Sequence, residues 1–265
     1  MSVPVIQARN LNMTFFTRKG SLGALEDFSL EAQRGEVVCI VGASGCGKST
    51  FLNIVAGFLE PTSGQVLLEG DEIQGVEPRC GMIFQDYSLF PWMTVLENIA
   101  FGPRLKGASR KERHQKAQRY IEMVGLEGFE QAYPGELSGG MQQRVALCRA
   151  LANEPDVLLC DEPFAALDAM TRQIMQQELL HVVSESQKTV LFITHSIDEA
   201  LILSDRLVVM SARPGRVKAI YNNDLPQPRT LDVQITDHFM KLKREVWDLV
   251  QEEVMGSMTA LQRVK

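Results

Sequence analysis

The sequence predicts an α/β fold into which a largely helical segment is inserted. Short apolar runs typical of buried strands recur along the chain and are separated by stretches compatible with helices. Between about residues 87 and 152 the strand-like runs give way to helical periodicity. The composition fits a globular protein, since 45% of the 265 residues are hydrophobic and 23% are charged.

The N-terminal part is expected to consist of strands around one helix. Val3 to Asn12 is strand-like, and Leu25 to Ala32 alternates apolar and polar residues as a half-buried strand does. Val37 to Val41 is continuously apolar, which is typical of a strand buried on both faces. A helix is predicted over Ser49 to Phe58, and a further strand over Gln65 to Gly70.

The middle of the chain carries a helix signal at Ser109 and Glu112. These two side chains have the spacing of a capping box, and Gly125 is placed to end the helix that begins there. Buried strands are then expected over the apolar runs 157–160, 189–194 and 207–210.

The last segment, Asp237 to Lys265, is predicted to be an amphipathic helix. Its apolar stripe contains Phe239, Leu242, Val246, Leu249 and Val250. Two interpretations stay open at this point: the stripe packs against its own domain, or it makes a dimer or regulatory contact.

Charge and composition exclude several classes of protein. The chain has 27 basic and 33 acidic residues, a net charge of −6, which argues against a generally basic nucleic-acid surface but leaves a local basic patch open. It has no apolar run approaching the roughly 20 residues of a spanning helix, and no signal-peptide pattern at its start. The five cysteines lack CxxC spacing, which favours a reduced, cytosolic protein.

A glycine-rich loop follows the buried run Val37 to Val41 and fits the pattern GxxxxGK[ST]. Glycines allow backbone N–H groups to converge on phosphate oxygens, and the helix that follows adds partial positive charge. We expect Lys48 to reach the β- and γ-phosphates of a nucleoside triphosphate, Ser49 to bind Mg²⁺ and Thr50 to bond a phosphate oxygen. Cys46 occupies a variable position and is not expected to be a nucleophile. The predicted phosphate loop comprises Gly42, Ala43, Ser44, Gly45, Cys46, Gly47, Lys48, Ser49 and Thr50.

Polar residues also end two other buried strands. Asp161 and Glu162 follow the run 157–160, and His195 follows the run 189–194. Ligands gather at the carboxyl ends of strands in open α/β sheets, so these side chains are expected near the phosphate loop. Asp161 is predicted to hold Mg²⁺, Glu162 to polarise an attacking water, and His195 to lie near the γ-phosphate.

A second anion-binding helix start is predicted at Ser138, Gly139 and Gly140. The chain has one phosphate loop but two such helix ends. A head-to-tail homodimer explains this, with each nucleotide between Lys48 of one copy and Ser138 of the other. An ordinary helix cap is the alternative interpretation of this motif.

Taken together and in order, these motifs resemble the nucleotide-binding subunit of an ABC transporter. The matching set is GASGCGKST, Gln85, LSGGM, LLCDEP, Ala166-Leu167-Asp168 and His195. The resemblance implies a RecA-like phosphate-loop NTPase core with an N-terminal antiparallel β region and a helical signature subdomain. It places the nucleotide-binding domain at 1–220, the helical subdomain at about 87–152 and a short, mainly helical extension at 221–265.

The resemblance also implies individual roles. Gln85 contacts Mg²⁺ and senses the transmembrane partner, and Asp168 reaches across the dimer. Phe15 stacks on adenine, although the adjacent Phe16 could do so equally. Smaller departures from the family pattern lie at Ala165, Cys148 and Ser196, but none removes a group needed for hydrolysis, so ATPase activity is expected.

A single cassette favours an importer assembled from separate subunits. Residues 211–217 are similar to those of nitrate, sulfonate and taurine importer ATPases, and the apolar segment 89–98 fits either a groove for a permease or ordinary core. The expected partners are a second ATPase subunit, transmembrane permease subunits and, indirectly, a solute-binding protein, with no nucleic acid. The expected location is peripheral, at the cytoplasmic face of the inner membrane. The alternatives are a soluble ABC-type ATPase in DNA repair or translation, and the ATPase of an exporter.

Overall fold

The computed structural model describes residues 3–18, 20–165, 167–186, 188–227, 229 and 231–262. The chain divides into two compact units, one formed by Met1–Glu77 with Gln187–Lys265 and the other by Pro78–Ser186. Both units combine strands with helices, and the predicted α/β class is confirmed. Within the described ranges, no helix is both long and apolar enough to span a bilayer.

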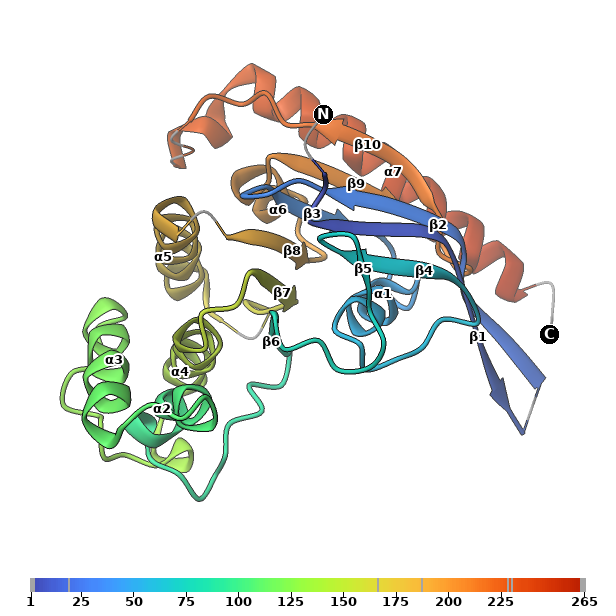
Figure 1. Ribbon diagram of the computed structural model, residues 1–265. Coiled ribbons are helices and arrows are strands. Elements are labelled where there is room, and N and C mark those ends of the chain that lie inside the picture. The colour runs from blue at the N-terminus through green and yellow to red at the C-terminus, as the bar shows by residue number, and fades with distance from the viewer. Residues whose placement is uncertain are drawn as a thin grey trace. The chain divides into compact units, whose positions relative to one another are not determined.

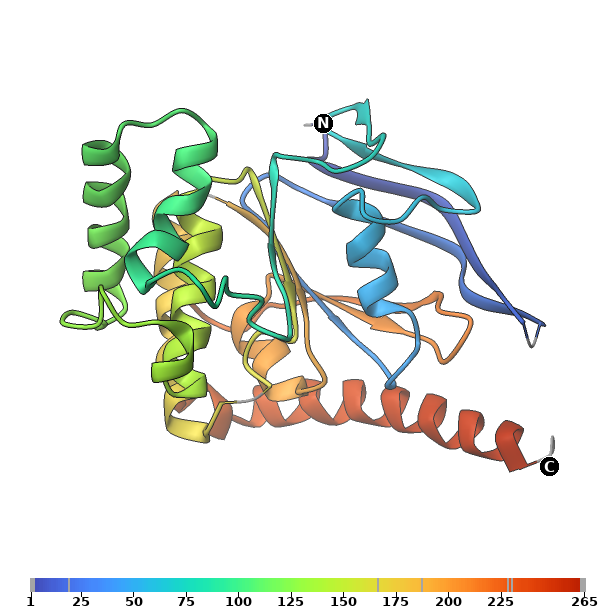
Figure 2. The same ribbon diagram turned by 90° about the horizontal axis from the view of Figure 1, so that it is seen from below.

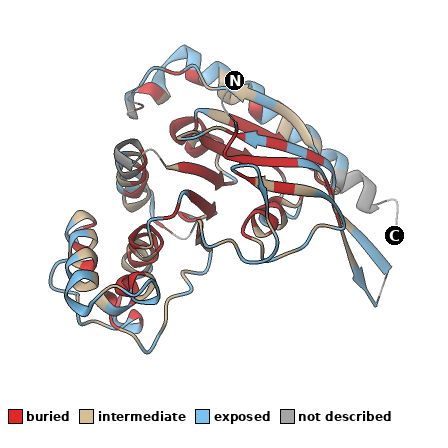
Figure 3. Ribbon diagram, viewed as in Figure 1, coloured by how far each residue is buried: buried red, intermediate tan, exposed pale blue. Residues whose placement is uncertain are grey.

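The first unit contains two sheets (Figure 1). The antiparallel sheet has the order β2-β1-β4-β5, with strands Gly20–Ala32, Ile6–Thr17, Ser63–Leu68 and Asp71–Glu72. In the second sheet β3 pairs in parallel with β8 and β9, and β10 is antiparallel to β9. These strands are Val37–Val41, Thr189–Ile193, Arg206–Met210 and Val217–Asn222. All five residues of β3 are buried, as its continuous apolar sequence predicts (Figure 3).

Helices cover both faces of this second sheet (Figure 2). Helix α1 (Lys48–Val55) lies between the two sheets, where Phe51 packs against Phe28 of β2 with ring centroids 4.6 Å apart. Helices α6 (Ile197–Leu203) and α7 (Asp237–Gln262) lie on the opposite face. The helix predicted over Ser49 to Phe58 ends earlier, because Gly57 has φ +73° and terminates it.

The predicted C-terminal stripe packs against its own unit. Helix α7 contacts α6, β9 and the short 3₁₀ helix η2 (Leu231–Ile235). Phe239 and Val246 are fully buried there, while Leu242, Leu249 and Val250 are half-buried. Lys265, the end of the predicted helix, lies outside the described residues.

The second unit combines a pair of parallel strands with helices. Its elements are β6 (Cys80–Ile83), α2 (Val95–Leu105), α3 (Arg110–Met123), η1 (Pro134–Glu136), α4 (Gly139–Ala152), β7 (Val157–Asp161) and α5 (Ala169–Ser186). Helices α2, α3 and α4 share an apolar core that includes Ile99, Ile121 and Val145, all fully buried. The capping box of Ser109 and Glu112 is confirmed at the start of α3, and Gly125 follows its end with φ +64°.

Candidate nucleotide-binding site

The glycine-rich loop of the first unit joins β3 to α1 at the carboxyl edge of the second sheet. Gly47 caps α1 with φ 110°, and a Cβ there would lie 2.6 Å from the carbonyl oxygen of Ala24. Gly45 also has positive φ, at +73°. Both positions favour glycine because side chains rarely adopt this backbone conformation. The predicted loop therefore has the tight path that its glycines were expected to allow.

Lys48 is the charged residue of this loop and is only 6% exposed. Its Nζ donates hydrogen bonds to the carbonyl oxygens of Gly42 at 2.9 Å and Ala43 at 3.1 Å. Both of these acceptors are neutral, and a buried ammonium bonded to neutral groups interacts strongly with an anion placed beside it. The loop backbone thus surrounds the ammonium group of Lys48 and holds it in place.

The first turn of α1 presents backbone donors. The first N–H groups of a helix have no partner within the helix, and no described side chain caps this one at Gly47. The hydroxyl-bearing Ser49 and Thr50 lie in the same turn, with Ser49 exposed. Backbone donors, the positive end of the helix and Lys48 together make an anion site suited to phosphates.

Cys46 lies inside the loop and is 1% exposed. Burial raises the pKa of its thiol, although Lys48, whose Nζ lies 3.9 Å from Sγ, acts in the opposite direction. A thiol with a raised pKa is a poor nucleophile, and Cys46 was not expected to act as one.

His195 and Phe15 belong to the same unit as the loop. Ile193 of β8 pairs with Ile40 of β3, so His195 lies at the sheet edge where the loop begins. Phe15 is on β1, two residues beyond the buried Met13, whereas Phe16 is 81% exposed. Because side chains alternate along a strand, Phe15 shares the face of Met13 and Phe16 does not.

In the second unit, β6 and β7 end side by side. Their pairing of Ile83 with Cys160 puts Gln85 and Glu162 at the same edge, together with Asp161 at the end of β7. Glu162 has φ 48°, a conformation that is uncommon for residues other than glycine and that recurs at functional sites.

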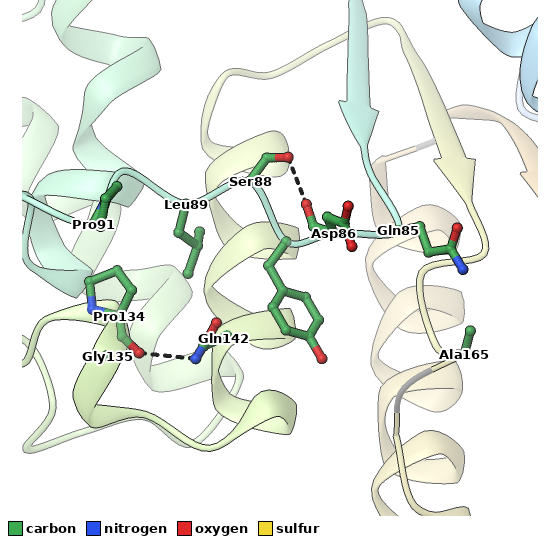
Figure 4. Close-up of a pocket in the computed structure, with 10 residues that line it drawn as sticks. Gln85, Asp86, Ser88, Leu89, Pro91, Pro134, Gly135, Gln142 and Ala165 are labelled. Carbon is green, nitrogen blue, oxygen red and sulfur yellow. Dashed lines mark hydrogen bonds between the residues drawn. The ribbon is translucent and has the colours of Figure 1, made fainter.

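Gln85 lines an open pocket of this unit together with Ala165 (Figure 4). The segment after Gln85 forms one wall of the pocket. Gln142 lies on the opposite side, where its Nε2 donates to the carbonyl oxygen of Pro134 at 3.0 Å. An amide side chain therefore flanks the opening on either side, and that of Gln142 is held by its bonds to the backbone.

The signature motif forms the start of α4. The Oγ of Ser138 accepts a hydrogen bond from the amide of Met141 at 3.3 Å, and Ser138 and Gly139 are exposed. A Cβ on Gly140 would lie 3.2 Å from Thr171 Cγ2 of α5, so the starts of α4 and α5 are neighbours.

Asp168 caps α5 by accepting hydrogen bonds from the amides of Met170 and Thr171. Its interactions with Thr171 lower the pKa of its carboxyl group. Ala166, the first residue of the predicted Ala166-Leu167-Asp168 motif, lies outside the described residues.

Two residues near these motifs were not predicted from the sequence. Arg149 of α4 donates to the carbonyl oxygens of Tyr87 at 3.2 Å and Ser88 at 2.6 Å, and its guanidinium lies 5.4 Å from the Phe90 ring. The hydroxyl of Tyr87 lies 3.0 Å from where a Cβ on Gly139 would be. Arg149 therefore fixes the segment after Gln85 beside the signature helix. Only its position on a helix otherwise rich in apolar residues could have indicated this role.

A glycine-rich loop around a buried lysine, between a parallel strand and a helix, defines a phosphate-loop nucleoside triphosphatase. The ABC transporter family profile matches residues 25–165 of the chain. A taurine import ATP-binding protein of Jannaschia sp. is 45% identical over 95% of this chain and 97% of its own length. A nitrate import ATP-binding protein of Synechocystis sp. is 43% identical over 93% and 95%, respectively.

A comparison with solved structures also finds ATP-binding cassettes. A dimeric ATP-binding cassette in a post-hydrolysis state, bound to ADP and Pi, has a TM-score of 0.75 and 34% identity, and the match covers 82% of this chain and 98% of that one. The chain therefore belongs to the ABC transporter family, as an ATP-binding subunit. It is an ATPase, as the sequence motifs predict.

Proposed function

We propose that this subunit hydrolyses ATP to power the import of a small anion, such as nitrate, a sulfonate or taurine, through a membrane-embedded transporter. The observation that carries this proposal is similarity over nearly the whole chain to taurine and nitrate import ATP-binding proteins. In this proposal residues 1–220 form the nucleotide-binding domain, with the helical subdomain at about 87–152, and 221–265 form an extension.

Each nucleotide is held first by the phosphate loop. Lys48 exchanges its bonds to Gly42 and Ala43 for the β- and γ-phosphates, since phosphate oxygens carry charge and carbonyl oxygens do not. The backbone of the loop and the start of α1 bind the remaining phosphate oxygens. Phe15 stacks on adenine, and its sharing of a strand face with Met13 favours it over the exposed Phe16.

A magnesium ion belongs to this site in our proposal. Ser49, Gln85 and Asp161 offer hydroxyl, amide and carboxylate oxygens, which are the donors that Mg²⁺ prefers. Ser49 is exposed at the start of α1, Asp161 is the last residue of β7, and Gln85 follows the neighbouring strand β6. The ion, when bound, neutralises charge that develops on the phosphate oxygens.

Hydrolysis is assigned to Glu162 and His195. Glu162 accepts a proton from the attacking water. The left-handed backbone conformation of Glu162 determines the direction in which its side chain leaves the main chain. His195 orients the γ-phosphate from the end of β8.

We also propose that two copies share each nucleotide. Ser138, Gly139 and Gly140 of one copy complete the phosphate site of the other, and Asp168 contributes from the start of α5. The exposure of Ser138 and Gly139 supports this, as does the dimeric form of a similar ATP-binding cassette. ATP stabilises the closed dimer, and hydrolysis with phosphate release reopens it.

The permease is proposed to dock on the second unit, Pro78–Ser186. A groove there is rich in aromatic and basic side chains, although it also contains Met93, Ala100 and the acidic Glu97; the others are Trp92, Phe101, Arg104, Arg110, Arg113 and His114. Trp92 is 69% exposed, and such an aromatic side chain with arginines around it is typical of a binding surface. The chain then lies peripherally at the cytoplasmic face of the inner membrane, with a solute-binding protein as an indirect partner.

Affinity purification of the tagged chain from detergent-solubilised membranes tests this function. The proposal predicts recovery of permease subunits, with a solute-binding protein whose bound anion can be identified. Recovery with ribosomes or DNA, and without membrane subunits, would contradict it. Trp92→Ala should weaken recovery of the permease while leaving ATP affinity unchanged.

A further inference from the structure

A tight turn at residues 211–216 connects β9 to β10. It is closed by hydrogen bonds from the amide of Ser211 to the carbonyl of Arg216 and from the amide of Arg216 to Oγ of Ser211, both at 2.9 Å. The Ser211 hydroxyl also donates to the carbonyl of Pro214 at 3.1 Å. The 211–216 turn is thus a defined structure, and none of the roles above uses it.

The backbone of this turn lies directly against the phosphate loop. A Cβ on Gly215 would collide with the carbonyl oxygen of Cys46 and lie 2.6 Å from Met210 Cε. The amide of Gly215 donates to the Ala24 carbonyl at 2.9 Å, and that same carbonyl lies against Gly47. The turn, β2 and the loop therefore meet backbone to backbone, and only glycine fits at Gly215.

Arg213 reaches from the turn to the loop. Its Nε and Nη2 donate to the carbonyl oxygen of Gly45 at 2.9 and 2.8 Å. A loop that turns its N–H groups toward phosphates directs carbonyl groups elsewhere, and these need donors of their own. The planar guanidinium supplies two donors in a fixed fork, so it restrains the direction of the Gly45–Cys46 peptide more firmly than one hydrogen bond can.

Helix α7 is hydrogen-bonded to the 211–216 turn at Ala212. Oε2 of Glu253 accepts from the amide of Ala212 at 2.7 Å, while its Oε1 pairs with Lys218 Nζ at 2.6 Å. Burial favours a raised pKa for the Glu253 carboxyl, but Lys218 and the Ala212 amide lower it overall. The carboxylate is therefore ionised at neutral pH, and it ties α7 to the residue next to Arg213.

We propose that Arg213 is a positioning residue that holds the phosphate loop in its nucleotide-binding conformation, and that Glu253 of α7 positions Arg213 through the turn. This inference rests on the proposed role of the loop in binding the triphosphate. Its consequence is that the C-terminal helix influences ATP affinity without touching the nucleotide.

Equilibrium binding of ATP, with and without Mg²⁺, tests this on the full-length chain. Arg213→Ala should weaken ATP binding about tenfold, as expected for losing a forked, charge-assisted contact. Arg213→Lys keeps the charge and one donor and should lose only part of this affinity. In ATPase assays KM should rise while kcat changes little, because the loop, once occupied, is restrained by the phosphates.

The matched control is Arg216→Ala. Arg216 is a guanidinium of the same turn, but it pairs with Glu26 at 2.5 Å instead of the phosphate loop. Its removal should leave ATP affinity unchanged. Equal weakening by Arg213→Ala and Arg216→Ala would mean that only nearby charge matters and would overturn the proposal, as would unchanged affinity in Arg213→Ala.

Glu253→Gln tests the link to α7. It should weaken binding about threefold, the order expected for one weakened charge-assisted hydrogen bond. Combined with Arg213→Ala it should add nothing further, because both act through the same turn. Independent effects that multiply would overturn the link.

Two controls separate this inference from the proposed function. Circular dichroism melting without nucleotide establishes that each variant is folded. Lys48→Ala should weaken ATP binding at least about a hundredfold, whether Arg213 is present or replaced. If Lys48→Ala binds ATP normally, the proposed nucleotide site is wrong. If Arg213→Ala binds ATP normally but Lys48→Ala does not, the nucleotide site is supported and the positioning role of Arg213 is wrong.

Discussion

Two helix starts in this chain carry anion-binding motifs, and they are built differently. At the start of α1, the residue before the helix is a left-handed glycine without a side-chain cap among the described residues, and Lys48 is buried beside it. At the start of α4, Ser138 itself caps the helix and no lysine is adjacent in the sequence. The first has a full charge in a restrained loop, and the second has only the partial charge of a helix end.

This difference indicates a division of labour. The phosphate loop can bind a triphosphate within one copy, because charge and oriented donors are both present. The signature end is too weak to bind a nucleotide by itself, since a helix terminus contributes about 0.3–1 kcal/mol when exposed. In the proposed dimer, it contributes once a second copy brings a nucleotide already held by its own phosphate loop.

The largest effect on ATP binding is expected from Lys48→Ala. It removes the only full positive charge within the phosphate loop and should weaken ATP binding at least about a hundredfold. Titration with a fluorescent ATP analogue measures this, and Lys116→Ala, which removes a lysine paired with Glu154, is the control. If Lys48→Ala bound ATP as tightly as Lys116→Ala, the start of α1 would have no advantage over the start of α4 in binding a nucleotide.

Glu162→Gln should lower kcat about a thousandfold, within the range for loss of a general base. ATP affinity should be retained, since the amide keeps the size of the carboxylate. Phosphate release measures the turnover, and Glu162→Gln should accumulate as a nucleotide-bound dimer. Turnover at the parental rate would show that the water is activated elsewhere.

Phe15→Ala should weaken ATP binding about fivefold to tenfold, since an aromatic stacking contact contributes about 1–1.5 kcal/mol. Phe16→Ala is the matched control and should bind normally, because its side chain is already 81% exposed on the other strand face. The reverse result would place adenine on the opposite face of β1.

The smallest effect on the single chain is expected from Ser138→Ala. Loss of the α4 cap should lower the free energy of unfolding by about 1 kcal/mol and leave ATP binding to one copy unchanged. Ser109→Ala removes the cap of α3 at similar cost and serves as the control. Only Ser138→Ala should weaken nucleotide-dependent dimerisation. If Ser138→Ala and Ser109→Ala dimerised equally well with nucleotide, Ser138 would be only a helix cap.

Local patterns predicted much of this architecture. The run Val37 to Val41 matches β3 at both ends, because a strand flanked on both sides needs an unbroken apolar sequence. The Ser109 capping box and the stop at Gly125 also act within a few residues, and both are confirmed.

Elements that depend on distant partners were not predicted. The two-residue strand β5 exists through its pairing with β4, and β10 is only half-buried along its pairing with β9. The contact of Arg213 with Gly45 joins residues 168 positions apart. No local periodicity encodes such a contact, although the motif at 211–217 was visible as a family resemblance.

Sedimentation of Glu162→Gln with saturating MgATP tests the central claim most directly. Two copies that share their nucleotides should sediment as a dimer with one ATP per chain, and should dissociate when the nucleotide is removed. A species that binds ATP fully and remains monomeric at every protein concentration would contradict the account.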